Sequence, residues 1–198
     1  NSFEEIQEEE AVTYTKEVDN VVITATAAQG VLPEDAELVV NEIGKENSQY
    51  SEVENQLNEK AAGEDYTVAG FLAYDIYFQD GEGNKLEPEE GTVKVSMKYK
   101  EAAVPEEVKE NAGISMLSID GAEATNTDSQ EFSIAVMHLV EDENGNIQSV
   151  VDMTAEGNAD VETNSERQIQ KAEFVTESFS VFTITWKNSN NKLAVHLI

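Results

Sequence analysis

Residues 92–100 read TVKVSMKYK and alternate strictly between apolar and polar side chains. In an extended chain the four apolar residues point to one side, and the polar residues between them point to the other. Such an alternation predicts a half-buried β-strand with one face on a core and one face in water. We therefore expect Lys94 and Lys98 to face water.

The same period of two recurs along most of the chain, so strands are the expected structure. Residues 71–78 are the expected neighbour of 92–100, with Leu72, Tyr74 and Ile76 turned inward. Further strands are predicted at 12–16, 20–27, 37–43, 115–119, 132–140, 147–153, 172–176, 179–186 and 192–197.

One segment, residues 48–62, has the spacing of a helix instead. Ser48 or Ser51 is expected to cap its start, and Gly63 to end it in the left-handed conformation. We expect one short amphipathic helix that lies on a sheet. Its apolar residues are Tyr50, Val53, Leu57 and Ala61.

The expected fold class is mainly β, with two packed β-sandwich-like units and this one helix. Residues 1–10 are an acidic leader in this scheme. Residues 11–104 would form the first β unit and 105–198 the second, joined by a connector, AAVPEEVKENAG, that includes a helical turn at 105–110.

Charge and composition exclude several classes of protein. The chain has 198 residues, with 12 basic and 41 acidic side chains, and a net charge of −29. Nucleic-acid binding needs phosphates neutralised by Lys and Arg, so we expect no nucleic-acid partner. Cysteine is absent, which excludes disulfides, thiol catalysis and thiolate metal sites. No apolar run is long enough for a transmembrane helix, so no membrane insertion is expected within this sequence.

The acidic stretch DGEGN, Asp80 to Asn84, has two interpretations. An EF-hand would require Gly at the sixth position and Glu at the twelfth, where this sequence has Lys85 and Gly91. The favoured interpretation is a hairpin turn rich in Gly and Asn. The alternative is a calcium site of another type, with Asp80, Glu82 and Asn84 as oxygen ligands.

A similar stretch, DENGN, occurs at 142–146. It adds Asp142 to the candidate calcium ligands, and calcium is the only cofactor that the sequence suggests. The match also agrees with two related β units, although it is short.

Candidate catalytic residues are few. Of the two histidines, His138 shares a strand face with apolar residues and is expected to be a hydrogen-bonded core residue, and His196 is two residues from the end of the sequence. Trp186 lies on the apolar face of its strand and is assigned to the core. The pair Lys187 and Asn188 is not a convincing donor set for an isopeptide cross-link. We expect no enzyme.

Four segments taken together, 21–43, 73–97, 136–150 and 174–184, resemble repeated modules of large secreted or wall-anchored proteins of Gram-positive gut bacteria. The first also resembles the opening strands of the ZU5 domain, a β-sandwich with a Gly-x-Leu-Pro signature. Gly30, Leu32 and Pro33 match that signature here.

The resemblance implies a non-enzymatic, extracellular structural or binding module of a bacterial cell-surface or secreted protein. Its partners would be a protein or glycan ligand and neighbouring domains of the same chain. The alternative is a calcium-dependent adhesion or carbohydrate-binding module that uses the acidic loops. Some ZU5 relatives cleave themselves at a His-Phe-Ser step; here Ser178 replaces the histidine before Phe179 and Ser180, which argues against self-cleavage.

Overall fold

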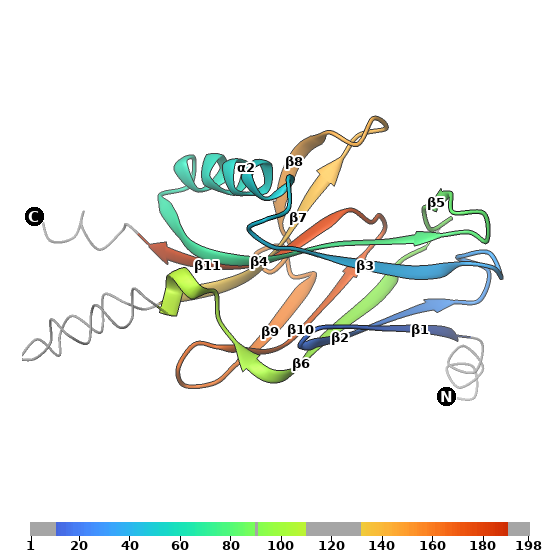
Figure 1. Cartoon of the computed structure of the whole chain (residues 1–198), viewed down its shortest axis with the longest axis horizontal. Coiled ribbons are helices and arrows are strands. Elements are labelled where there is room, and N and C mark those ends of the chain that lie inside the picture. Colours follow the sequence, from blue (N-terminus) through green and yellow to red (C-terminus); the bar gives the residue numbers. More distant parts are fainter. Residues whose placement is uncertain (1–10, 90, 110–131, 190–198) are drawn as a thin grey trace, which may run out of the picture.

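The computed structural model describes residues 11–89, 91–109 and 132–189. These residues form eleven strands and the helix α2, with a further helical turn at 106–109 (Figure 1). The bounds are β1 Ala11–Val18, β2 Val21–Ala28, β3 Glu37–Ile43, α2 Tyr50–Ala62, β4 Tyr66–Gln79, β5 Lys85–Leu86, β6 Val93–Ala103, β7 Phe132–Glu141, β8 Ile147–Asp152, β9 Ala159–Thr163, β10 Ile169–Thr176 and β11 Val181–Ser189.

The strands form two antiparallel sheets. Sheet A has the order β1-β2-β6-β10-β9, and sheet B has the order β3-β4-β11-β7-β8, with β5 paired to β4. The sheets pack face to face, and α2 lies on the side of sheet B that faces away from sheet A (Figure 1). The predicted class, mainly β with a sandwich-like arrangement and one short amphipathic helix, is confirmed.

Both halves of the sequence contribute to both sheets. β6, from the first half, pairs with β10, and β4 pairs along its length with β11. The packed layers are therefore the two sheets, and the predicted boundary at residues 104 and 105 does not separate one sheet from the other. The strand period specifies which face is buried but says nothing about the strand partner.

The prediction that segment 71–78 is the neighbour of 92–100 is wrong. β4 and β6 belong to different sheets, and β6 lies between β2 and β10. The turn after β4 does form a hairpin, but its second strand is the two-residue β5, with Phe78 opposite Leu86. The chain then crosses to sheet A before β6 begins.

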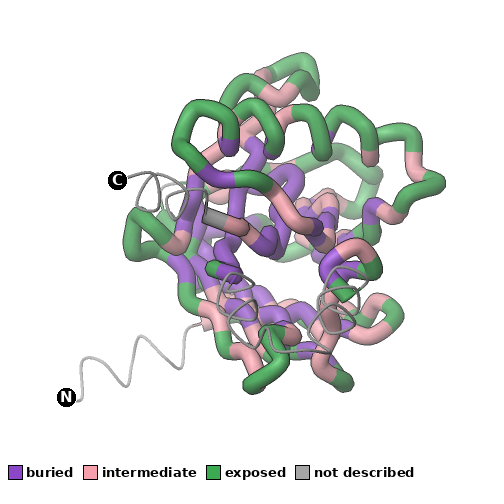
Figure 2. The backbone as a smooth tube through the Cα atoms, turned by 90° about the vertical axis from the view of Figure 1, so that its left-hand side faces the viewer, coloured by how far each residue is buried: buried purple, intermediate pink, exposed green. Residues whose placement is uncertain are grey.

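The main core fills the space between the sheets. Figure 2 shows the buried positions along the inner sides of both layers, with exposed turns at the rim. Phe78, Val95, Phe132 and Phe182 are buried there, as predicted, and Trp186 is fully buried. A buried pair of hydroxyls, Tyr74 Oη and Tyr99 Oη at 3.0 Å, links the two sheets, with Tyr74 on β4 and Tyr99 on β6.

The second core lies between α2 and sheet B. Val53, Leu57 and Ala61 are buried against it, as their spacing predicts. The predicted serine N-cap is wrong, because Gln49 occupies that position without a side-chain hydrogen bond. Gly63 is the C-cap, as predicted, but its φ of −84° is right-handed and not left-handed. The sheet positions beneath the helix are Phe71, Ala73, Ala135, Met137, Leu139 and Val181.

Two strands were not predicted, β5 and β9, which are short and rich in polar residues. The predicted leader 1–10 and the predicted strands 115–119 and 192–197 lie outside the described residues, as does His196. Among the described helices, none combines the length and the apolar character needed to cross a bilayer.

Candidate binding surface

The outer face of sheet A is the broadest candidate surface. Its residues alternate with buried ones along each strand, as in β6, where Lys94, Ser96 and Lys98 lie between core side chains. Within the described residues, no helix or strand packs on this face, whereas α2 covers part of the outer face of sheet B (Figure 1). We call this surface the A face.

Three cross-strand rows, together with Lys100, which pairs with Glu17 of the first row, define the A face. The strand registers align Glu17, Val22, Lys98, Lys171 and Glu162 in the first row. They align Thr15, Thr24, Ser96, Glu173 and Asp160 in the second row, and Thr13, Thr26, Lys94 and Val175 in the third.

The charge of the A face differs from that of the whole chain. It carries four lysines, 94, 98, 100 and 171, and four carboxylates, Glu17, Asp160, Glu162 and Glu173. These formal charges cancel, although the chain as a whole has a net charge of −29. The lysines lie on the central strands β6 and β10, and three of the carboxylates lie on the outer strands β1 and β9.

Two of these lysines form ion pairs, and two form none with the described residues. Lys100 forms an ion pair with Glu17, and Lys171 forms one with Glu173 at 3.0 Å. Within the described part of the chain, Lys94 and Lys98 form no ion pair. Lys98 is also directly opposite Lys171 in the sheet, and like charges in that position are destabilising. A partner that brought carboxylates to Lys94 and Lys98 would neutralise these positive charges.

Small hydroxyl side chains occupy the β1–β2 side of the A face. Thr13 is directly opposite Thr26, and Thr15 is directly opposite Thr24. Threonine suits an exposed, pleated surface, and opposed threonines stabilise strand pairing. Val175 is the exposed apolar residue of the face, with 40 % of its surface accessible.

The predicted hairpin turn at Asp80 to Asn84 is confirmed. The backbone N–H of Asp80 donates to the carbonyl of Asn84 at 2.9 Å, and Gly83 has a φ of +89°. Asp80 Oδ1 accepts the backbone N–H groups of Glu82 and Asn84, both at 2.9 Å. Its Oδ2 accepts the Asn84 amide at 3.2 Å.

The loop at 142–146 repeats this geometry. The Asp142 N–H donates to the carbonyl of Asn146 at 2.8 Å, and Asp142 Oδ1 accepts the N–H groups of Asn144 and Asn146 at 2.8 and 3.0 Å. Gly145 has a φ of +85°. The similarity of the two sequences therefore reflects one type of turn.

A third loop of the same type joins β9 to β10. Asn164 Oδ1 accepts the N–H groups of Glu166 and Gln168, both at 3.0 Å, and the Asn164 N–H donates to the carbonyl of Gln168. Arg167, with a φ of 63°, takes the position that Gly occupies in the other two loops. The stretch contains no Gly-Asn pair, which is why the pattern did not predict this turn.

The candidate calcium ligands Asp80 and Asp142 accept hydrogen bonds within their own loops. Asp80, Glu82 and Asn84 share one loop, whereas Asp142 belongs to a different hairpin of sheet B. Hydrogen bonds from Asn84, then from the backbone of Glu82 and Gly83, hold the pKa of Asp80 below its usual range. The described residues contain no cluster of three His, Asp or Glu side chains suited to a metal ion. The carboxylates of Asp80 and Asp142 are used to build the turns.

His138 is a hydrogen-bonded core residue, as predicted. It is 5 % exposed and stacks on Phe182 with ring centroids 4.2 Å apart. Its Nε2 lies 2.9 Å from Ser180 Oγ, and the Ser180 hydroxyl donates to the carbonyl of Leu139 at 2.7 Å. Since that hydroxyl proton is committed to Leu139, Nε2 must carry the proton in its own hydrogen bond, and His138 is not placed to act as a base toward Ser180.

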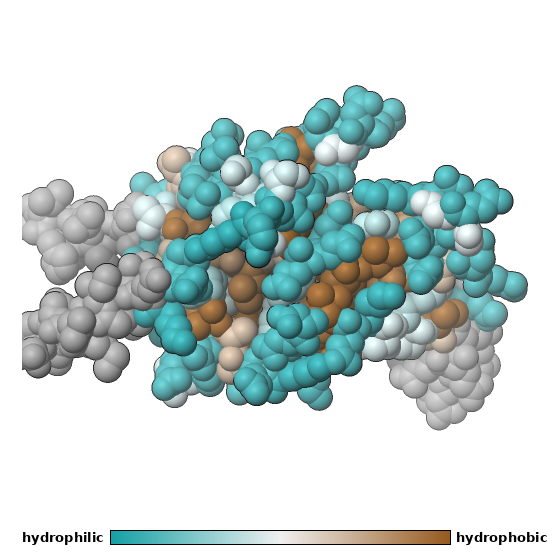
Figure 3. Space-filling view, in the orientation of Figure 1, coloured by the Kyte–Doolittle hydropathy of each residue, from teal (hydrophilic) through white to brown (hydrophobic). Residues whose placement is uncertain are grey.

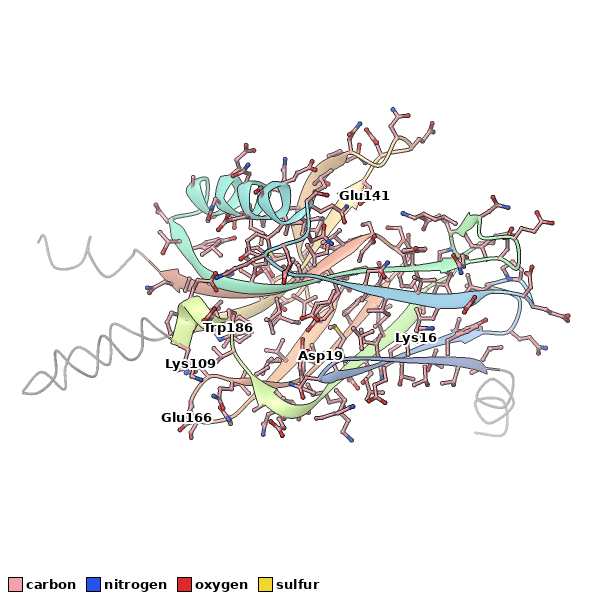
Figure 4. The ribbon with its side chains drawn as sticks, in the orientation of Figure 1. Lys16, Asp19, Lys109, Glu141, Glu166 and Trp186 are labelled. Atoms are coloured by element: carbon pink, nitrogen blue, oxygen red, sulfur yellow. The ribbon has the colours of Figure 1, made fainter. Side chains whose placement is uncertain are left out.

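Lys187 has a partner that the sequence did not reveal. Its Nζ lies 2.9 Å from Asp152 Oδ2, with side-chain exposures of 19 % for the lysine and 8 % for the aspartate. Asp152 Oδ1 also accepts the N–H of Ala155, and Lys187 Nζ lies 4.8 Å from the ring centroid of Tyr66. The pair links β11 to the end of β8. Trp186, beside it in sequence, donates from Nε1 to the carbonyl of Arg167 and lies between the layers (Figure 4).

Sheet B also has a carboxylate with an unsatisfied oxygen. Asp75 Oδ1 on β4 is buried and has no hydrogen-bond partner within the described residues. Burial raises the pKa of Asp75, and Lys85 opposes that rise. Burial and then Asp75 raise the pKa of Glu141, which lies at the end of β7 (Figure 4).

Two grooves are further candidate binding sites. A groove of about 550 Å³ lies beside the Gly30 to Pro33 turn, with Tyr14, Glu34 and Glu89 among its lining residues. A second, of about 320 Å³, lies where Lys45 pairs with Glu107 and Tyr50 stacks on Phe71. On the side shown in Figure 3, apolar surface forms patches in a band across the middle, and hydrophilic residues surround it.

The sequence pattern predicted that Lys94 and Lys98 face water, and both are exposed. It did not predict the A face as a unit, because its rows depend on which strands pair. Comparisons of the chain with protein-family models, with curated proteins and with solved structures found no match.

Proposed function

We propose that this protein is a non-enzymatic structural and binding module, and that it contacts other macromolecules through the A face. The observation that carries the proposal is the charge arrangement of that face. A β-sandwich supports it by holding a broad surface in a fixed shape, since the strands of sheet A are hydrogen-bonded to one another and backed by the core.

The resemblance to ZU5-like modules of secreted or wall-anchored bacterial proteins supports an extracellular location, on the cell surface or after secretion. The module would then be one unit among neighbouring domains of a longer chain. Labelling of intact and permeabilised cells of the source organism with an antibody against this module tests the location. Staining only after permeabilisation would contradict it.

A binding screen tests the use of the A face. The purified protein is tested against extracellular proteins, glycans and itself, and every interaction is repeated with the double variant Lys94→Glu/Lys98→Glu. The control is Lys45→Glu/Lys60→Glu, which changes the net charge by the same amount away from the A face. We expect binding to be lost in the first variant and retained in the control.

Equal binding by both variants would contradict the A face as the contact surface. Turnover of any substrate by the wild-type protein on a broad hydrolase panel would contradict the non-enzymatic role. Far-ultraviolet circular dichroism on each variant verifies that the sheets are intact.

A further inference from the structure

We propose that the partner of the A face is the A face of a second copy of this chain, related by a twofold axis that runs along β10. The inference rests on the proposed function, since it requires the A face to be the contact surface. Three features support it: the order of charges across the sheet, the exposed side chain of Val175, and the net charge of the chain.

The order of charges is self-complementary about β10. β6 and β9 lie on either side of β10, and in the first row Lys98 on β6 corresponds to Glu162 on β9. In the second row Ser96 on β6 corresponds to Asp160 on β9. A rotation of 180° about β10 places β6 of one copy over β9 of the other. Lys98 and Glu162 share one row of the sheet, so each Lys98 meets the Glu162 of the other copy, twice in the dimer.

Residues on β10 meet their own counterparts at the axis. Val175, 40 % exposed in the single copy, would be buried against its equivalent. In each copy Lys171 forms an ion pair with Glu173 at 3.0 Å. Two ion pairs without net charge, one from each copy, would therefore lie at the axis. Sheets packed face to face are about 10 Å apart, which leaves room for interdigitated side chains of this size.

Other partners satisfy only part of the A face. An acidic ligand would pair with Lys94 and Lys98 and would be repelled by Asp160 and Glu162. A basic ligand would pair with these two acids and would be repelled by the two lysines. A second copy supplies Glu162 to Lys98 and Lys98 to Glu162, and it places the hydroxyl of Ser96 over Asp160, so the acids of β9 meet no like charge on β6.

Net charge opposes association everywhere else on the molecule. Two copies at −29 repel one another, and this repulsion extends about 30 Å at 0.01 M salt and about 8 Å at 0.15 M. The charges of the A face cancel, so two copies can approach there with the least repulsion. Dimer formation should therefore increase as salt rises from 0.01 to about 0.15 M, because long-range repulsion is screened first.

The experiment measures the mass of the protein in solution by sedimentation velocity across a concentration series at both salt levels. It uses wild type, Lys98→Glu, Glu162→Lys, and an equimolar mixture of the two variants. Controls with the same charge changes on α2 are Lys60→Glu and Glu59→Lys. Circular dichroism verifies the fold of each.

We expect wild type and both controls to dimerise, and each A-face variant alone to associate about tenfold or more weakly, since like charges then face each other twice. The mixture should recover the dimer. In a mixed dimer the two substituted side chains face each other with opposite charges, and the second contact keeps the native Lys98 and Glu162. Recovery on mixing is specific to a twofold contact between these two positions.

Three outcomes overturn the proposal. The variants and the wild type dimerise equally, or the mixture associates no better than its components, or the wild type is monomeric at all concentrations and salt levels. If the wild type is monomeric but Lys94→Glu/Lys98→Glu still abolishes binding to another partner, the second-copy inference fails and the proposed function stands. If no interaction depends on the A face, both fail.

Discussion

The outer faces of sheets A and B are built by the same alternation and differ in what occupies the outward positions. In sheet B several of these positions are apolar, among them Phe71, Met137 and Leu139, and α2 covers them. In sheet A they are threonines, lysines and carboxylates, and no described element covers them. Apolar outward residues bind a layer of the same chain, whereas the polar and charged outward residues of sheet A stay open within the described residues.

The helix contact gives the largest expected difference between the faces. Leu57→Ala removes a side chain that is 1 % exposed between α2 and sheet B, and should lower the free energy of unfolding by about 2–5 kcal/mol. Thr24→Ala on the A face should change it by no more than about 0.5 kcal/mol. Urea denaturation of both variants measures this. Similar losses at the two sites would contradict the distinction between a covered and an open face.

A second contrast compares two lysine–carboxylate pairs. Lys187→Met leaves the Asp152 carboxylate buried without its cation, and should cost about 3 kcal/mol, the low end for buried pairs. Lys171→Met breaks a more accessible pair on the A face, with both side chains 33 % exposed, and should cost about 0–1 kcal/mol. Thermal and urea unfolding at pH 7 test the comparison. An equal cost for the two would show that the Lys187 pair is solvated.

Much of the fold could be predicted from the sequence, because burial follows the period of two. The strict alternation at Val93 to Tyr99 identified both the core residues and the exposed lysines of β6. The helix was found because Val53, Leu57 and Ala61 share one face. These signals are local, and each residue's environment follows from its neighbours in sequence.

Strand pairing could not be predicted in the same way. The partner of β6 on one side is β10, which is far away in the sequence, and nothing in TVKVSMKYK specifies it. The like-charge pair Lys98 and Lys171 and the ion pair Lys187 and Asp152 depend on such long-range neighbours. The Asn164 loop was missed for a local reason, because Arg167 adopts a positive φ where the other loops have Gly.

Acid should weaken the interior through His138. Burial lowers the pKa of His138 to about 4, below the usual value near 6.5. The folded state thus resists protonation that the unfolded chain accepts, so stability is lost as pH falls from about 6.5 to about 4, by up to about 3 kcal/mol.

The measurement compares wild type with His138→Gln over that range. Carboxylates such as Glu42 and Glu141, whose pKa values burial raises, contribute with the opposite sign in both proteins and cancel in the difference. The variant should lose less stability on acidification. If the difference in the free energy of unfolding between the two proteins stayed the same from pH 7 to pH 4, the assignment of a neutral, buried imidazole would be contradicted.

Calcium should have the smallest effect. The carboxylates of Asp80 and Asp142 are committed to turn hydrogen bonds in sheet B hairpins. The melting temperature in calcium should match that in magnesium at equal ionic strength, and chelator should not lower it. A rise specific to calcium at low millimolar concentration would support the alternative of a calcium-dependent module.

The A face as a contact surface is tested most directly by amine labelling. The protein is acylated briefly at low and at high concentration, and the modified lysines are quantified by peptide mass spectrometry. Lys94 and Lys98 should lose reactivity toward acylation as the protein concentration rises, while the reactivity of Lys60 on α2 should stay unchanged. Unchanged reactivity of Lys94 and Lys98 in fully associated protein, or protection of Lys60 in their place, would contradict it.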